Sequence, residues 1–145
     1  MLYGANPVLG RGKDDHSLQA VMRVTAPLIS VKQYKAGASI GYAASYVCET
    51  DMCVGYLGIG YGDGLPRDLD RSATVFCNGH ACSVLGRVSM DSIAIDLSDA
   101  SSAQIGDQAV LWGPEHSVEI LAKAANTISY ELMTSIRGTR DYISS

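Results

Sequence analysis

The chain has 145 residues, of which 47% are hydrophobic and 18% are charged, and this balance excludes an intrinsically disordered protein. One domain of this length buries roughly two-thirds of the surface of its unfolded chain. The net charge of −4 argues against nucleic-acid binding, because no basic stripe is available to neutralise phosphates. No apolar run is long enough to cross a membrane as a helix, so we expect no membrane partner.

The first 19 residues differ in composition from the rest of the chain. Positions 4–19 are rich in glycine, proline and charge, which predicts a linker, and Met1–Gly4 reads like the end of a strand. We therefore expect residues 1–19 to form a junction with an upstream segment, and residues 20–145 to form the domain itself.

Residues 20–145 predict a mainly β fold. Runs of β-branched or alternating apolar residues predict strands over 20–34 with a bend near Pro27, 53–60, 73–77, 81–88, 90–97, 108–112 and 136–143, and a strand or a strand and loop over 39–50. Asn78-Gly79 predicts a type I′ hairpin. Ser117 can cap a helix that ends before Asn126, and a second short helix is expected over 130–134. Short strands followed by late helices indicate an antiparallel barrel or a sandwich.

The cysteines and histidines do not predict a metal site. Each of the two cysteine pairs has a gap of four residues, whereas the usual zinc knuckle has a gap of two. We expect all four cysteines to be reduced and mostly buried. The histidines lie in polar stretches or in a turn, and we expect them to be solvated. These residues are Cys48, Cys53, Cys77, Cys82, His16, His80 and His116.

A glycine-rich stretch, Gly58-Ile59-Gly60-Tyr61-Gly62-Asp63-Gly64-Leu65-Pro66-Arg67, lies at the centre of the chain. As a strand it would leave one backbone face bare and point Tyr61 and Asp63 to the other face. Glycine weakens a strand, so such a run indicates a bulge or a close approach by a ligand or by neighbouring backbone. Arg67 follows the strand-ending Pro66, where a cation can meet a carboxylate or phosphate. The alternative is a tight barrel strand whose glycines only make room for packing.

Tyrosine is the candidate reactive residue, because the chain has eight tyrosines against one phenylalanine. Tyr42 lies between Gly41 and two alanines, a setting that leaves a side chain accessible. A phenol that acts as a base near neutrality needs its pKa lowered by about 3, which corresponds to about 4 kcal/mol. No histidine or arginine lies near Tyr42 in sequence, so the positive charge must come through the fold or from another chain. The alternative is a hydrogen-bonded structural tyrosine.

Two further stretches combine polar groups with a possible anion site. In Gly86-Arg87-Val88-Ser89-Met90-Asp91, the backbone N–H of Met90 is a candidate anion donor at a junction between strands. The alternative there is a β-bulge with a surface salt bridge. Thr127-Ile128-Ser129-Tyr130-Glu131 places a tyrosine at a helix start, and ordinary capping is its alternative.

The chain resembles the C-terminal domain of bacterial alanine racemase through four sequence motifs, in this order and spacing: SIGYAASY, IGYGDGLPR, GRVSMD and TISYELMTSIR. The resemblance runs from Met1 to about Arg140. It implies an antiparallel, Greek-key β-barrel that follows a pyridoxal-phosphate-binding TIM-type barrel. The cofactor lysine and the phosphate-binding residues would then lie upstream of residue 1. A homodimeric, cytoplasmic enzyme that interconverts L- and D-alanine is also implied, and this chain alone would be inactive.

The resemblance assigns roles to six residues. Tyr42 matches the catalytic tyrosine opposite the cofactor lysine, and the position of Met90 contacts the substrate carboxylate through its backbone N–H. The matches to other active-site tyrosines are Tyr61 and Tyr130, with Tyr130 at the substrate entrance, and the matches to entry-corridor arginines are Arg67 and Arg87. The chain departs from the family at Ser89, where some members have cysteine, and at 137–140, which lack the Val-Pro of many members.

The implied reaction explains why a tyrosine is needed. Racemisation passes through a planar carbanion that the cofactor stabilises, and the proton leaves from one face and returns on the other. Two bases on opposite faces are therefore required. In the family, the lysine removes the α-proton of D-alanine, so Tyr42 would remove the α-proton of L-alanine. The family delivers this tyrosine across a dimer interface, which agrees with the absence of local charge near Tyr42.

Other functions stay open at this point. One alternative is a racemase with broader substrate choice. Another is a decarboxylase with the same two-domain plan, but the motifs GYGDGLPR and VSMD disfavour the decarboxylase. A free-standing β-domain that acts only in dimerisation or binding is an alternative from a different class. An in-frame barrel with a pyridoxal lysine upstream of Met1 would favour the racemase.

Overall fold

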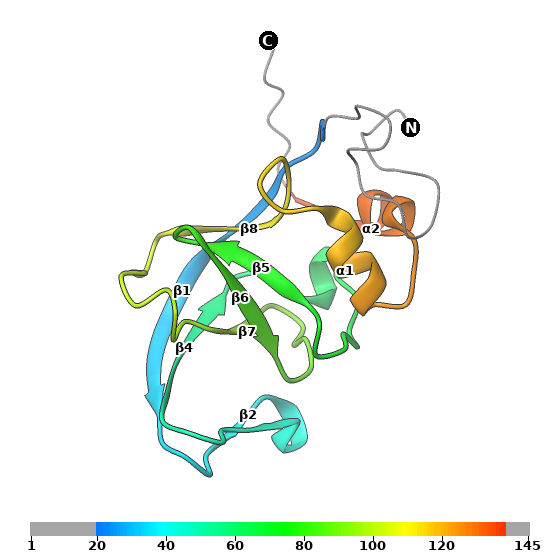
Figure 1. Cartoon of the computed structure of the whole chain (residues 1–145). Coiled ribbons are helices and arrows are strands. Elements are labelled where there is room, and N and C mark those ends of the chain that lie inside the picture. The colour runs from blue at the N-terminus through cyan, green and yellow to red at the C-terminus, as the bar shows by residue number, and fades with distance from the viewer. Residues whose placement is uncertain (1–19, 139–145) are drawn as a thin grey trace.

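The computed structural model of the chain describes residues 20–138 and shows a closed antiparallel barrel with two short helices beside it (Figure 1). The six barrel strands lie in the order β1-β4-β7-β6-β5-β8. Their bounds are Val24–Tyr34 (β1), Met52–Leu57 (β4), Thr74–Cys77 (β5), His80–Leu85 (β6), Ile93–Asp96 (β7) and Gln108–Trp112 (β8). The predicted mainly β barrel is confirmed, and the sandwich is excluded. The predicted junction, 1–19, lies outside the described residues.

The strand order contains two overlapping Greek keys. Strands β5, β6 and β7 form a meander, and β4 and β8 lie at its two edges. The chain reaches the meander from β4 through the long connection 58–73, and it reaches β8 from the meander through 97–107. The glycine-rich stretch belongs to the first of these connections, and it therefore lies outside the barrel wall.

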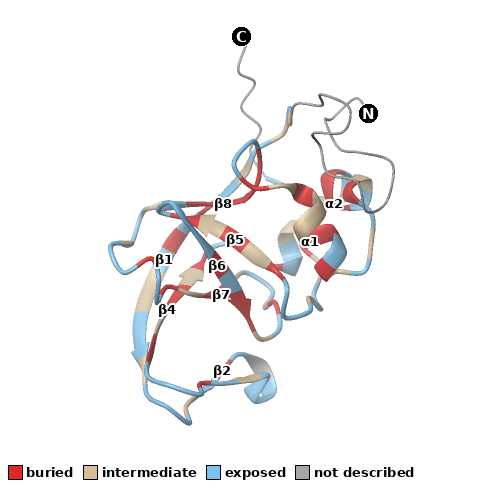
Figure 2. Ribbon diagram, viewed as in Figure 1, coloured by how far each residue is buried: buried red, intermediate tan, exposed pale blue. Residues whose placement is uncertain are grey.

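Alternating side chains of the strands fill the barrel, and the two helices cover it. Helix α1 (Val118–Ala124) and helix α2 (Ser129–Ser135) add apolar side chains to the same core. Figure 2 shows buried residues along β8 and on one side of each helix. Full burial of a leucine contributes about 1.5–3 kcal/mol, and Leu121 and Leu132 are each 2% exposed. The helices are therefore held mainly by their apolar faces. Neither is long and apolar enough to span a bilayer, and the same is true of any helix within 20–138.

Local turn and cap chemistry follows the sequence closely. Asn78 and Gly79 both have positive φ, at 50° and 85°, as a type I′ hairpin requires. The Ser117 hydroxyl accepts a hydrogen bond from the Glu119 N–H, and it caps α1 as predicted. Asn126 follows the helix with φ of 53°, a left-handed conformation that ends a helix.

Several predicted strand bounds are wrong: β1 begins at Val24 and not at Ala20, and β6 ends at Leu85 and not at Val88. Strand β4 ends at Leu57 and not at Gly60, and residues 61–63 form the 3-10 turn η3 (Tyr61–Asp63) instead of an alternating strand. The Gly60 N–H donates to Asp63 Oδ2 at 2.9 Å, so a local carboxylate replaces the sheet partner. Strand β7 begins at Ile93 and not at Met90. No strand covers 136–138, and the rest of the predicted closing strand, 139–143, lies outside the described residues.

His116 is buried, which corrects the expectation of a solvated side chain. It is 5% exposed, and its Nε2 lies 2.8 Å from the Thr74 carbonyl oxygen. Its ring stacks on Phe76 with a centroid distance of 6.5 Å. One strong backbone partner and one aromatic contact satisfy the ring inside the protein. The exposed His80 agrees with expectation, and His16 lies outside the described residues.

The cysteines are free, as expected. Cys48, Cys77 and Cys82 are buried, and Cys53 is half-buried. Burial raises the pKa of the Cys77 thiol and raises that of Cys82 to about 11. These thiols stay protonated at neutral pH, which suits packing side chains better than reactive ones.

Residues 35–51 leave the barrel between β1 and β4, and we call them the Tyr42 arm. The arm contains β2 (Ser39–Ile40), the 3-10 turn η2 (Tyr42–Ala44) and β3 (Tyr46–Val47), and it projects beyond the barrel wall in Figure 1. Its apolar side chains form a small second core with the barrel, made of Ile40, Cys48, Met52, Val54, Leu85 and Ala94. The arm is therefore packed on the barrel.

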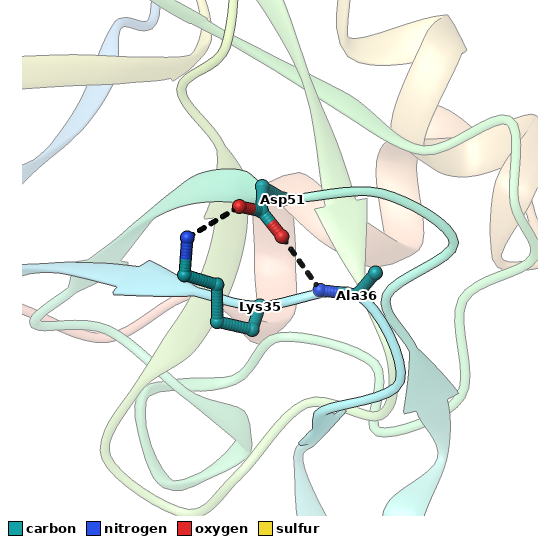
Figure 3. A network of polar contacts seen from close by, with 3 residues as sticks. All are labelled: Lys35, Ala36 and Asp51. Carbon is teal, nitrogen blue, oxygen red and sulfur yellow. Dashed lines mark hydrogen bonds and ion pairs between the residues drawn. The ribbon is translucent and has the colours of Figure 1, made fainter.

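Asp51 closes the base of the Tyr42 arm. Its carboxylate accepts hydrogen bonds from Lys35 Nζ at 2.6 Å and from the Ala36 N–H at 3.0 Å (Figure 3). The bond from Lys35, followed by that from Ala36, holds the pKa of Asp51 below its usual value. The two ends of the arm are thus joined by one charged side chain.

We predict that the Asp51 carboxyl titrates below the ordinary aspartate value of 3.8. A lowered pKa in the folded chain means that this contact stabilises fully above the ordinary value and is lost as the pH falls through the folded value. Carboxyl ¹³C chemical shifts followed against pH would measure the midpoint. Lys35→Ala should raise the midpoint of Asp51 and leave Asp70 unchanged, because the lowered pKa of Asp70 depends on Ser72. An unchanged Asp51 midpoint in that variant would contradict the contact.

Candidate functional site

The candidate site is built on two segments that leave neighbouring strands. The crossover segment, residues 58–67, follows β4, and the Met90 loop, residues 86–92, joins β6 to β7. Leu57 pairs with Ile93 across β4 and β7, so the first segment leaves the wall where the second returns to it. The two segments are therefore neighbours in space although they are far apart in sequence.

Two backbone hydrogen bonds join the crossover segment to the Met90 loop. The Tyr61 N–H donates to the Ser89 carbonyl at 3.0 Å, and the Gly62 N–H donates to the Met90 carbonyl at 2.9 Å. A Cβ on Gly60 would overlap both carbonyls. The glycine therefore permits this approach of one backbone to another. The glycine run therefore permits a close approach by neighbouring backbone at Gly60, as one of the two interpretations predicted. The alternative, a barrel strand whose glycines only make room for packing, does not hold there.

The crossover segment also meets the end of helix α2. Gly64 has φ of 99°, and its carbonyl accepts a hydrogen bond from the Ser135 hydroxyl at 2.9 Å. The Arg137 N–H donates to the Asp63 carbonyl at 2.7 Å. An open hollow of about 530 Å³ lies at this junction, lined by Tyr61, Gly62, Gly64, Thr134, Ser135, Ile136 and Arg137.

A side chain of the Tyr42 arm contacts the Met90 loop. The Arg87 N–H donates to the Ser45 hydroxyl at 3.1 Å. The next residue, Val88, donates its N–H to the Arg67 carbonyl at 3.1 Å, which links the loop to the end of the crossover segment. The arm, the loop, the crossover segment and α2 thus form one connected surface.

The structure brings most of the predicted site residues onto this surface. Tyr61 lines the hollow and is 42% exposed, while the side chain of Met90 is 58% exposed. The Met90 N–H has no hydrogen-bond acceptor within residues 20–138. Tyr42 belongs to η2, and its side chain lies outside what the structure describes. Tyr130 is the second residue of α2 and is not among the residues that line the hollow.

The two predicted arginines differ in their partners. Arg87 Nε lies 3.3 Å from Asp68 Oδ1 in an exposed ion pair, as the surface salt-bridge alternative for its loop anticipated. Within the described chain, the guanidinium of Arg67 has no ion-pair partner, and its carbonyl accepts from Val88. An exposed pair contributes about 0–1 kcal/mol, so a carboxylate ligand can compete for either cation.

Sequence reasoning did not single out Ser45 or Ser135. Each hydroxyl meets a segment more than 40 residues away, Arg87 for Ser45 and Gly64 for Ser135. The neighbouring glycines were visible in the sequence, but their partners were not. Only the folded chain shows which hydroxyls fill the space beside them.

The described residues do not fit a holding site for pyridoxal phosphate. Lys35 is bound by Asp51, and Lys32 Nζ lies 5.7 Å from the ring centre of Tyr56 on the barrel wall. Lys123 is exposed in the last turn of α1. None of these three lysines lines the hollow at Tyr61. Between residues 20 and 138, no cluster of histidine, cysteine or acidic residues is suited to a metal ion either.

Comparison with known proteins identifies the family. The family model described as alanine racemase, C-terminal domain, matches residues 21–142. The chain belongs to the alanine racemase C-terminal domain family. Alanine racemase of Piscirickettsia salmonis is 46% identical over 144 residues, which are 99% of this chain and 86% of that protein. Alanine racemase of Shewanella amazonensis is 41% identical over 135 residues, which are 93% of this chain and 37% of that protein.

Solved alanine racemases share this fold. The structure from Acinetobacter baumannii has a TM-score of 0.90 at 39% identity and covers 94% of this chain, which corresponds to 38% of that one. The alanine racemase from Bartonella henselae, described with covalently bound pyridoxal phosphate, has a TM-score of 0.84 at 36% identity, with 94% and 38% covered. This alanine racemase domain thus spans little more than a third of the length of those enzymes.

We predict that Gly60→Ala destabilises the domain by about 1–3 kcal/mol, because its Cβ would push against backbone that cannot move away cheaply. The φ of −148° at Gly60 is open to any residue, so the cost is steric and not conformational. Urea unfolding of the chain would measure it. Gly58→Ala is the matched control, since the nearest atoms to its Cβ would belong to side chains, Ile29 Cγ2 at 3.1 Å and Pro27 Cγ at 3.7 Å. Equal costs for the two variants would contradict the close contact.

Proposed function

We propose that this chain is the catalytic-tyrosine domain of an alanine racemase, with Tyr42 as one of two acid–base groups. The observation that carries the proposal is the contact between the Tyr42 arm and the Met90 loop through Ser45 and Arg87. This contact puts the segment of the proposed base next to the segment of the proposed carboxylate site. Membership of the racemase domain family supplies the reaction to which such a pair belongs.

The Met90 loop is the proposed binding site for the carboxylate of alanine. The Met90 N–H has no acceptor among the described residues, and a carboxylate oxygen would satisfy it. Arg67 and Arg87 lie at the same surface and favour the approach of an anion. The exposed fractions of Tyr61 and Met90, 42% and 58%, leave room for a substrate and for a second domain above it.

Tyr42 is proposed to hold or move the α-proton on one face of alanine. Bound pyridoxal phosphate makes this α-proton acidic. The second face needs another base, which we assign to a lysine of the cofactor-binding domain, because the described lysines of this chain are committed elsewhere or face no cofactor cradle. Tyr42 would give a proton in one direction and take one in the other.

A partner subunit is proposed to complete the site. A phenol acts as a base near neutrality only when positive charge or strong hydrogen bonds lower its pKa. The contact with Ser45 brings Arg87 to the Tyr42 arm, but this cation is already paired with Asp68 at 3.3 Å. We therefore infer that the charge that tunes Tyr42 comes from the barrel of a second protomer, in a homodimer that binds L- and D-alanine.

We predict that Tyr42→Phe in the full-length enzyme slows racemisation in both directions by ~100- to 10,000-fold, because each direction needs both groups. Exchange of the α-proton with solvent should survive for D-alanine, whose proton faces the lysine, and should nearly vanish for L-alanine. Proton NMR of each enantiomer in heavy water would follow both exchanges. The same measurement on Tyr61→Phe and Tyr130→Phe provides the controls.

Equal loss of exchange for the two enantiomers in Tyr42→Phe would mean that Tyr42 only shapes the site. An asymmetry found in Tyr61→Phe or Tyr130→Phe instead would move the role of base to that tyrosine.

We also predict that the 145-residue chain alone neither racemises alanine nor binds pyridoxal phosphate at one defined site. Its described lysines offer the cofactor no phosphate cradle next to an amine. Titration of the chain with the cofactor, followed by absorbance and by mass spectrometry after borohydride reduction, would measure specific binding. One equivalent bound at one lysine would refute the prediction.

A further inference from the structure

Ser45 occupies an unusual place for an exposed serine. It directly follows η2, and its hydroxyl accepts the hydrogen bond from the Arg87 N–H at 3.1 Å. Leaving aside the side chain of Tyr42, which the structure does not describe, this is the hydrogen bond that ties residues 41–45 to another part of the chain. The hydroxyl therefore acts over a sequence separation of 42 residues.

Two glycines make room for this hydroxyl. A Cβ on Gly41 or on Gly86 would lie 2.6 Å from Ser45 Oγ, which is closer than such atoms approach. Gly41 belongs to the Tyr42 arm and Gly86 to the Met90 loop, and both have positive φ, at 80° and 67°. The hydroxyl thus fits between two bare stretches of backbone, one from each segment.

The backbone around Tyr42 needs such an anchor. Ala43 and Ala44 both have left-handed conformations, with φ of 56° and 52°, which residues with a Cβ rarely adopt. Strained backbone persists only where surrounding contacts hold it in place. The contact between Ser45 and Arg87 begins one residue after this strained pair, so it is placed to hold it.

We propose that Ser45 is a positioning residue that fixes the backbone of Tyr42 relative to the Met90 loop. The inference rests on the proposed function of Tyr42. Loss of the hydroxyl removes the link between the segment of the base and the segment that binds the carboxylate. The substrate still binds, but the distance between its α-carbon and the base is no longer set. A displacement of about 1 Å can reduce a rate about 100-fold.

The test compares Ser45→Ala with Ser45→Thr and Ser98→Ala in the full-length enzyme. Ser98 is the control, because it is also exposed and its hydroxyl also makes a hydrogen bond, which it donates to Asp96 at 2.6 Å away from the site. We expect kcat to fall by about 10- to 100-fold in Ser45→Ala with KM changed by less than about threefold. Ser45→Thr keeps the hydroxyl and should restore most of kcat, and Ser98→Ala should leave kcat unchanged.

Proton exchange separates positioning from general stability. In Ser45→Ala, exchange of the α-proton of L-alanine should slow about as much as kcat, while that of D-alanine should stay within about threefold of its normal rate. A merely structural loss would lower both exchanges together. A cofactor-independent readout is amide hydrogen exchange of Arg87 in the 145-residue chain, which should become faster in Ser45→Ala and stay normal in Ser98→Ala.

The outcomes distinguish this inference from the proposed function. Asymmetric exchange in Tyr42→Phe without any asymmetry in Ser45→Ala would overturn the positioning role and leave Tyr42 as the base. Unchanged amide exchange at Arg87 would overturn it as well. Equal loss for both enantiomers in Tyr42→Phe would overturn the proposed function itself. If Ser45→Ala unfolds the protein, Ser45→Thr decides: poor activity in a well-folded Ser45→Thr would overturn the inference.

Discussion

The backbone of Gly60 lies against the carbonyls of Ser89 and Met90, and this approach brings together the segments on which the site is built. The crossover segment and the Met90 loop leave the barrel wall beside each other, because β4 and β7 are paired in the first Greek key. Without a side chain at position 60, the two backbones come close enough for hydrogen bonds from Tyr61 and Gly62. The hollow at Tyr61 and the position of the Met90 backbone both depend on that contact.

The barrel serves the site as a rigid frame, and the Tyr42 arm is an addition to it. Full closure of the sheet leaves no free edge, so the long connections can carry chemistry without exposing strand edges to other chains. The arm has a small apolar core around Ile40 and Cys48, an ion pair between Asp51 and Lys35, and a hydrogen bond from the Arg87 N–H to the Ser45 hydroxyl. Three different kinds of interaction thus hold a short segment whose backbone at Ala43 and Ala44 is strained.

The sequence was informative wherever the deciding interaction was local. The Asn78-Gly79 hairpin, the Ser117 cap and the strand over 108–112 depend on neighbouring residues, and the structure has them as predicted. The close approach predicted for the glycine run is present at Gly60, whereas the strand that its period of two suggests is not, because the carboxylate of Asp63 turns the backbone aside. His116 was expected in solvent because its neighbours are polar, but its partner Thr74 lies 42 residues away.

The candidate site shows the same division between local and distant interactions. Each of the motifs that contain Tyr42, Tyr61 and Met90 is visible in the sequence. Their order along the chain indicates the family that the comparisons identify. The contacts between these motifs could not be predicted from the sequence. Each contact joins two segments that only the barrel topology brings together. Ser45 is the clearest case, since neither its hydrogen bond nor its fit between two glycines has a local signal.

We propose that this domain completes an active site whose lysine belongs to another protomer. The most direct test mixes two inactive full-length enzymes, one carrying Tyr42→Phe and the other lacking the cofactor lysine, and allows their subunits to exchange. If the tyrosine and the lysine come from different protomers, each mixed dimer has one site with both groups intact, and racemase activity should return after mixing. If both groups come from one protomer, every site in the mixture lacks either the tyrosine or the lysine. Inactivity that persists after subunit exchange has been demonstrated would contradict a site shared between protomers.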